Sequence, residues 1–168
     1  MWSSDLTLVT GSVDIGGQRA GLAMQFAETM GMRYEDIGSF VGNTESIGFT
    51  ANTGGSRTTF ATGWAVYEAA QDMKRQLVQR AAQIWTVDAS SVTYDDDGVI
   101  RGPEGKQLTL KEIAAQLSAT GTQVQAHAAV KPGGVGAALS THICDVEVDV
   151  DTGKVTVLRY TAVQDVEI

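Results

Sequence analysis

Cysteine, proline and clustered basic residues are scarce in this sequence, and each shortage excludes a class of protein. Cys144 is the single cysteine, so neither an internal disulfide nor a four-thiolate zinc or iron–sulfur site can form. With 2 prolines, the chain is neither collagen-like nor a proline-rich linker. The net charge is −8, and no Lys and Arg cluster of the kind that contacts a phosphate backbone is present. A nucleic-acid partner is therefore not expected.

Long apolar runs and metal-ligand clusters are missing as well. No apolar run approaches the roughly 18 residues that a transmembrane helix requires, so no membrane span is predicted. Residues 1–5 lack the basic and apolar layout of a secretory signal, which makes a cytoplasmic location the default expectation. His127 and His142 lie far apart without neighbouring ligands, so we predict no zinc site.

What remains is the composition of a folded domain. The chain has 168 residues, of which 43% are hydrophobic and 19% charged, enough for one compact domain or two small lobes. We interpret residues 1–168 as one partial domain, with 1–120 and 121–168 as its candidate lobes. Strand-like segments begin and stop almost at the chain ends, so we expect a fragment of a larger subunit.

Hydrophobic periodicity predicts an α+β fold, in which a mixed sheet packs against two or three helices. The first half contains a strand at 7–13, a helix at 19–30 ended by Gly31, a strand at 36–41, a polar loop at 42–59 and a long helix at 60–85. The second half contains a hairpin at 91–101 with an acidic turn, a helix from a capping box at 109–112 to about Leu117, a strand at 124–130 and a hairpin built from 144–150 and 154–163.

The last hairpin alternates apolar and acidic residues. Cys144, Val146 and Val148 alternate with Asp145 and Glu147, a pattern that predicts one buried and one solvated face. Cys144 falls on the apolar face, so we expect a buried and unreactive thiol.

A first glycine turn lies between the first predicted strand and its helix. It consists of Gly16, Gly17, Gln18 and Arg19. Such a turn leaves backbone N–H groups unpaired at a helix start, where phosphate or another anion can bind. The alternative interpretation is an ordinary tight turn.

A second glycine segment precedes the long helix and contains more donors. Its residues are Gly54, Gly55, Ser56, Arg57 and Thr58, followed by Thr59. Hydroxyl, N–H and guanidinium donors at a helix start suit a pyrophosphate or a heterocycle rich in acceptors. Neither the GxxxxGK nor the GxGxxG nucleotide-binding motif is present. A helix-capping loop with a solvent-exposed Arg57 explains the composition equally well.

Both glycine segments belong to a series that resembles one enzyme family. In order, the segments are GSVDIGG (11–17), AMQFAE (23–28), VGNTES (41–46), TGGSRTT (53–59), DVEVD (145–149) and TGKV (152–155). The series is similar to the C-terminal cofactor-binding region of the molybdopterin-binding large subunit of the family of xanthine dehydrogenase, aldehyde oxidase and aerobic carbon monoxide dehydrogenase. The resemblance spans nearly the whole chain, which makes the combination specific although each segment alone is weak.

The resemblance implies a cofactor, a site and partners. The fold would be part of the second molybdopterin-binding domain, and the cofactor would be molybdopterin cytosine dinucleotide with molybdenum. The first loop would lie beside the molybdenum and its pterin, and the second would hold the dinucleotide. Iron–sulfur clusters and FAD would reside only on partner chains or domains. The partners would be the rest of the molybdenum subunit, an iron–sulfur subunit and, as a further candidate, an FAD subunit.

The sequence departs from the family pattern at two positions. Many members have Gly-Gln-Gly in the first loop, where this chain has Gly16, Gly17 and Gln18. The family's catalytic Glu follows a Gly-Val-Gly segment, but here the corresponding glycines precede Ala137. We therefore assign no catalytic residue and expect the chain alone to be inactive.

The function that follows is the cofactor-binding portion of a molybdenum hydroxylase. Such an enzyme oxidatively hydroxylates an aldehyde, an N-heterocycle or a similar small substrate with water as the oxygen source. Two alternatives remain: a non-catalytic assembly module derived from such a subunit, and a generic domain for phosphate ligands. The second needs only the glycine loops and leaves the other matching segments unexplained.

Overall fold

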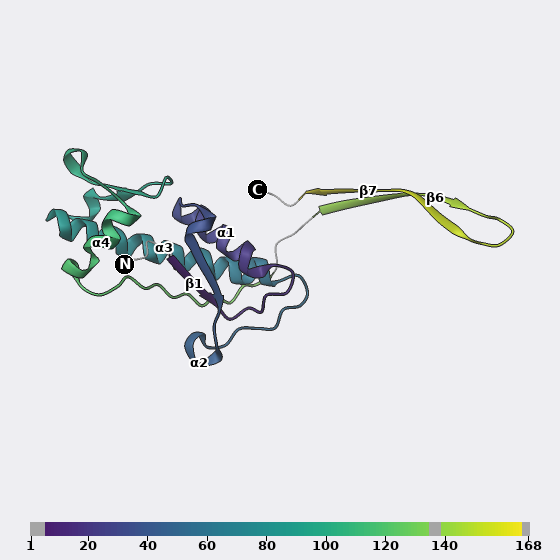
Figure 1. Cartoon of the computed structure of the whole chain (residues 1–168), viewed down its shortest axis with the longest axis horizontal. Helices are drawn as coiled ribbons and strands as arrows, with labels where there is room; N and C mark the ends of the chain where they lie inside the picture. The colour runs from purple at the N-terminus through teal and green to yellow at the C-terminus, as the bar shows by residue number, and fades with distance from the viewer. Residues whose placement is uncertain (1–5, 135–138, 166–168) are drawn as a thin grey trace. The chain divides into compact units, whose positions relative to one another are not determined.

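The computed structural model describes residues 6–134 and 139–165, which fall into two compact units, Met1–Gly133 and Gly134–Ile168. The first unit contains β1 (Leu6–Thr10), α1 (Gln18–Met30), β2 (Ile37–Val41), α2 (Thr44–Ile47), α3 (Thr58–Trp85), β3 (Thr93–Tyr94), β4 (Val99–Arg101), β5 (Gln107–Thr109) and α4 (Leu110–Thr120) (Figure 1). The second contains β6 (Leu139–Val148) and β7 (Val155–Asp165). The α+β class is confirmed, with the strands divided among three small sheets.

The first unit begins with a parallel strand pair joined by a helix. β1 and β2 pair in register from Leu6 with Ile37 to Thr10 with Val41, and α1 provides the crossover that a parallel pair requires. α1 ends as predicted at Gly31, whose φ of 62° is left-handed. A Cβ at Gly31 would overlap the Asp96 carbonyl oxygen, so the backbone conformation and the close contact both require glycine.

α3 carries the centre of the hydrophobic core. Its buried stripe includes Val66, Leu77 and Ala81, which lie on the helix predicted at 60–85. They pack in one cluster with side chains of α1, the small antiparallel sheet and α4, of which the most buried are Leu22, Met30, Ile100 and Ile113. Each large apolar side chain in such a core contributes about 1.5–3 kcal/mol through burial.

The hairpin and capping box in the middle of the chain are confirmed. β3 and β4 pair antiparallel, and the turn carboxylates Asp95 and Asp97 accept hydrogen bonds from Arg101 at 2.5 and 2.8 Å. At the start of α4, Glu112 accepts from the Thr109 amide at 2.8 Å while its own amide donates to the Thr109 hydroxyl. The short β5 and α2, three and four residues long, were not predicted.

The predicted strand at 124–130 is wrong. The segment is extended but lies outside every sheet, and its even-numbered residues are the less exposed ones. It lies along α3, where the Gln76 side chain donates to the Gln125 carbonyl at 2.9 Å and Arg80 donates to the Thr120 and Thr122 carbonyls. The alternation therefore reflects one side facing a helix, because no described strand pairs with this segment.

The terminal hairpin forms as predicted, but the face that was expected to be buried is exposed. β6 and β7 pair antiparallel with an irregularity between Asp145 and Val146. Asp149 accepts from the Asp151 and Thr152 amides in the turn, and these N–H donors lower the pKa of its carboxyl. Neither strand has a buried residue, and Cys144 is exposed, so the expected buried face and buried thiol are both wrong within this chain. A two-stranded ribbon has no second layer of its own to cover either side.

Among the described residues, no helix combines the length and apolarity needed to cross a membrane.

Candidate functional site

The first glycine turn lies directly before α1. Gly16 and Gly17 have φ of 74° and 83°, and Gly17 is the residue that caps the helix. A Cβ at either position would meet no atom within 4 Å, so these glycines serve the backbone conformation and leave open space above the helix end. Within residues 6–134 and 139–165, the amides of Gly16, Gly17 and Gln18 have no hydrogen-bond acceptor.

Asp14 occupies part of this helix end, and the sequence analysis gave it no role. Its carboxylate accepts from the Arg19 amide at 3.0 Å and from the Arg19 guanidinium at 2.7 Å. The hydrogen bond from the Arg19 backbone amide, and after it the hydrogen bond from the Arg19 guanidinium, lower the pKa of the Asp14 carboxyl. An acidic residue shortly before a helix start is a recognised capping signal, and it could have identified Asp14.

The second glycine segment lies directly before α3. Gly55 and Ser56 both have left-handed φ, 61° and 57°, and Arg57 caps the helix. No hydrogen bond or ion pair of the half-buried Arg57 guanidinium occurs within the described part of the chain. The Thr58 hydroxyl is buried and has no hydrogen-bond partner there either.

The structure brings the two predicted segments together. The Thr59 hydroxyl, on the first turn of α3, donates to the Gln18 carboxamide oxygen on the first turn of α1 at 3.0 Å. Just beyond it, the Ser12 and Thr62 hydroxyls bond at 2.7 Å. Each helix start carries the equivalent of about half a positive charge, so the two adjacent starts form one electropositive region. Gln18 therefore links the two loops, and its NH2 donors have no acceptor among the described residues.

Close packing of α1 on α3 holds this arrangement. After Gln18 meets Thr59, Gln25 meets Gly63 further along, so the two helices run in the same direction. A Cβ at Gly63 would overlap the Gln25 carboxamide, so a larger residue here would displace the end of the Gln25 side chain from the surface of α3. The relative position of the glycine loops thus depends on the packing of α1 against α3 as well as on the Gln18–Thr59 hydrogen bond.

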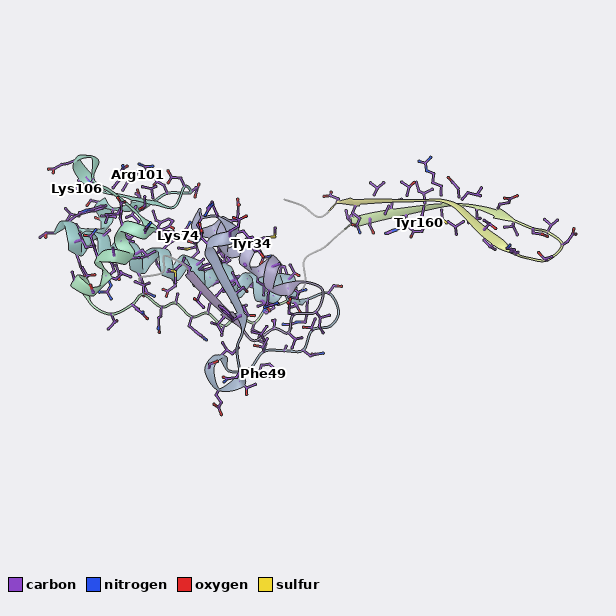
Figure 2. The ribbon with its side chains drawn as sticks, in the orientation of Figure 1. Tyr34, Phe49, Lys74, Arg101, Lys106 and Tyr160 are labelled. Carbon is purple, nitrogen blue, oxygen red and sulfur yellow. The ribbon has the colours of Figure 1, made fainter. Side chains whose placement is uncertain are left out.

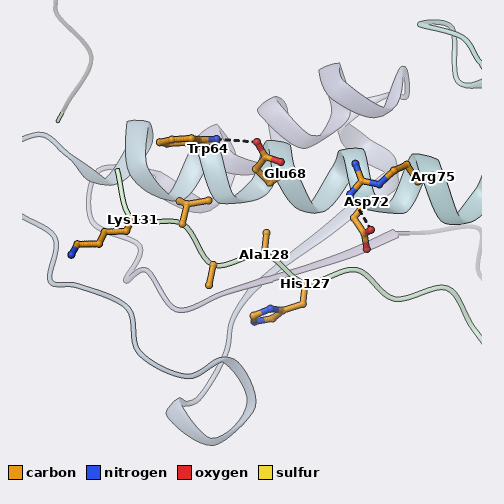
Figure 3. Close-up of a pocket in the computed structure, with 9 residues that line it drawn as sticks. Trp64, Glu68, Asp72, Arg75, His127, Ala128 and Lys131 are labelled. Atoms are coloured by element: carbon orange, nitrogen blue, oxygen red, sulfur yellow. Dashed lines mark hydrogen bonds and ion pairs between the residues drawn. The ribbon is translucent and has the colours of Figure 1, made fainter. Parts of the chain in front are cut away.

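One groove of the first unit lies elsewhere on α3. It has a volume of about 590 Å³ and lies between one face of α3 and residues 127–131 (Figure 3). Its polar groups pair locally: Trp64 donates to Glu68 at 3.1 Å and Arg75 to Asp72 at 3.1 Å. No residue of either glycine segment lines it, and no group of three metal-binding side chains occurs in the part of the chain that the structure describes.

Comparison with known proteins shows the family to which the chain belongs. Residues 3–167 match the family described as the molybdopterin cofactor-binding domain. The chain belongs to this family. The carbon monoxide dehydrogenase large chain of Afipia carboxidovorans is 27% identical over 155 residues, which cover 89% of this chain and 19% of that one. The resemblance inferred from the glycine segments and the terminal hairpin is thereby confirmed.

Solved structures give the same result for the fold of this molybdopterin cofactor-binding domain. A Cu,Mo-CO dehydrogenase in the carbon monoxide reduced state matches at a TM-score of 0.79 and 25% identity, covering 93% of this chain and 20% of that one. Quinoline 2-oxidoreductase from Pseudomonas putida 86 matches at 0.80 and 20% identity, over 96% and 22%, and shows the shared fold alone. The domain spans about a fifth of the length of the relatives it matches.

The comparison of Ala137 with the family's catalytic Glu falls outside the described residues.

Proposed function

We propose that this domain holds the molybdenum cofactor in a hydroxylase of the xanthine dehydrogenase and carbon monoxide dehydrogenase type. The residues assigned to this contact are Gly16, Gly17, Gln18, Arg19, Gly54, Gly55, Ser56, Arg57 and Thr58. The observation that carries the proposal is the Gln18–Thr59 hydrogen bond, because it places two helix starts from distant parts of the sequence beside each other. Two neighbouring helix starts provide N–H donors for one anionic ligand.

The residues present fit a dinucleotide cofactor. Space is open above Gly16, Gly17 and Gly55, where no side chain would be met within 4 Å. Among the described residues, the Arg57 guanidinium has no partner, and the Thr58 hydroxyl has none either; leaving such a buried donor without an acceptor costs about 1–3 kcal/mol. A pyrophosphate offers such acceptors, which supports the molybdopterin cytosine dinucleotide form for this chain.

Each loop has its own role in binding. The first loop would face the molybdenum and pterin end, with the Gln18 NH2 group as donor and Asp14 holding Arg19 in place. The second would hold the phosphates through Arg57 and the α3 amides. When bound, the cofactor supplies the redox chemistry for hydroxylating an aldehyde, an N-heterocycle or a similar small molecule with water as oxygen source. This chain binds and orients that group, and no proton-transfer residue is assigned to it.

The activity and partners follow from the same proposal. The domain spans a fifth of its relatives, so catalysis requires the rest of a molybdenum subunit and electron-transfer partners carrying iron–sulfur clusters and, as a further candidate, FAD. We place the assembly in the cytoplasm. The alternative is an assembly module that derives from such a subunit and no longer binds the cofactor.

The test is the cofactor content of the native complex purified through this chain. Cells that actively make molybdoenzymes should yield near-stoichiometric molybdenum together with a cytosine nucleotide, and the co-purifying polypeptides should carry the iron–sulfur clusters. A complex without molybdenum from such cells would overturn the proposal and leave the assembly module. A different nucleotide would overturn only the cytosine form.

A further inference from the structure

The chain that leads from α2 into α3 is held at two points. Thr50 packs so closely against Gly11 that a Cβ added at Gly11 would overlap the Thr50 hydroxyl oxygen. Thr58, the first residue of α3, is 3% exposed. Between these two anchors, residues 51–57 are all described by the structure, and none of them is buried or belongs to a helix or strand. We call residues 51–57 the α3 loop.

Between its anchors, the α3 loop is held by few contacts. Within residues 6–134 and 139–165, no backbone N–H group of the loop has an acceptor, and no side chain of the loop makes a hydrogen bond or an ion pair. Phe49, which precedes the first anchor, is 95% exposed, and its ring points into solvent beside α2 (Figure 2). A segment without buried side chains or internal hydrogen bonds has low local stability.

The end of the α3 loop has a backbone conformation that its own contacts do not explain. Gly55 and Ser56 both have left-handed φ, 61° and 57°. Glycine reaches this region freely, but a serine is strained there and stays in it only where its surroundings hold it. Since no described residue bonds to Ser56, we expect the turn to be held by a ligand that accepts from its N–H groups.

We propose that the α3 loop is a flap that becomes ordered when the anionic part of the cofactor binds at the start of α3, an inference that rests on the proposed function. The buried Thr58 hydroxyl, which has no partner among the described residues, and the Arg57 guanidinium lie at the end of this loop. An anion that accepts from them and from the loop N–H groups supplies the hydrogen bonds that the loop lacks. Binding and ordering of the loop are then coupled in free energy. A loop that is open before binding also leaves the start of α3 accessible for entry.

The experiment is hydrogen–deuterium exchange of the native complex, followed by mass spectrometry. The complex is purified through this chain from cells that make the pterin and from cells that cannot. Residues 51–53 are the informative part, because the proposed function assigns them no contact with the cofactor. Ordering predicts that their amides exchange more slowly with the cofactor, by on the order of tenfold or more, together with those of residues 54–57. The turn at Asp96, which packs against Gly31 at the other end of α1, is the control and should exchange alike in both complexes.

The other outcomes separate the two proposals. Equal exchange of residues 51–53 in the two complexes, when the first contains near-stoichiometric molybdenum, contradicts the flap and leaves the proposed function standing. Protection confined to residues 54–57 also contradicts the flap, because it shows contact with the cofactor without ordering of the loop. A complex that lacks molybdenum although its cells make the pterin contradicts the proposed function, and the flap with it.

Discussion

At the scale of single residues, Asp14 fixes the conformation of the first glycine turn before α1. Its carboxylate holds both the amide and the guanidinium of Arg19, so the loop approaches α1 in a fixed conformation. These donors stabilise the ionised carboxylate, which lowers the pKa of Asp14 in the folded protein below its usual 3.8. A lowered folded-state pKa contributes stability above the unfolded value, and that contribution is lost as pH falls through the folded value.

Asp14→Asn should therefore be less stable than the wild-type chain at neutral pH. The difference in the free energy of unfolding should persist down to about pH 4 and shrink as the pH falls further, because the wild-type carboxyl then becomes protonated. Urea denaturation of both proteins between pH 7 and pH 3 measures it. A difference that stays constant over this range would contradict the assigned role.

The Gln18–Thr59 bond should be measurable as an energetic coupling between the two loops. Gln18→Leu, Thr59→Val and the double variant form a cycle in which each single change removes the same hydrogen bond. The expected coupling is about 0.5–1.5 kcal/mol in the free energy of unfolding, as for other neutral hydrogen bonds. Strictly additive effects would show that the two loops do not communicate through this contact.

At the scale of elements, two glycines of α1 and its cap should respond in opposite directions to the same substitution. Gly31→Ala meets a left-handed φ and the Asp96 carbonyl, so it should cost about 2–4 kcal/mol. Gly21→Ala lies within the helix with no atom within 4 Å, so it should stabilise by about 0.5–1 kcal/mol. Urea denaturation measures both, and destabilisation of similar size in each would contradict the described packing.

The long helices could be predicted from the sequence because the patterns that define them are local. The apolar period of α3, the stop at Gly31 and the Thr109–Glu112 capping box each lie within a few residues. The strand expected at 124–130 was wrong because contact with a helix produces the same alternation as a sheet. The exposure of Cys144 was also missed, since alternation shows which face is apolar and not what covers it.

The sequence predicted the two glycine turns of the candidate site but not the contact between them. The glycine turns are visible because glycine before a helix has a local meaning, and the structure places both where expected. Their meeting through Gln18 and Thr59 spans 41 residues, and the Ser12–Thr62 bond spans 50. No local pattern encodes such contacts, because they depend on how α1 packs against α3.

At the scale of the whole molecule, the domain is one part of a larger binding surface. It spans about a fifth of its matched relatives, and it holds two helix starts side by side, at which we propose that the cofactor binds. These features are consistent with one another: a cofactor held at the edge of this domain would be enclosed by the remainder of the subunit. The proposed function requires that the glycine loops of this chain hold the cofactor.

The most direct measurement is the molybdenum and nucleotide content of the native complex with Arg57→Gln, compared with wild type. The Arg57 guanidinium at the second loop has no partner in the part of the chain that the structure describes, so its loss should reduce the retained cofactor several-fold after gel filtration, as expected when a charge-assisted contact worth about 1.5–3 kcal/mol is removed. Arg33→Gln is the control, because Arg33 pairs with Asp36 beyond the opposite end of α1, and it should retain the wild-type content. Equal cofactor content in all three complexes would contradict the assignment of the second loop as the grip on the cofactor.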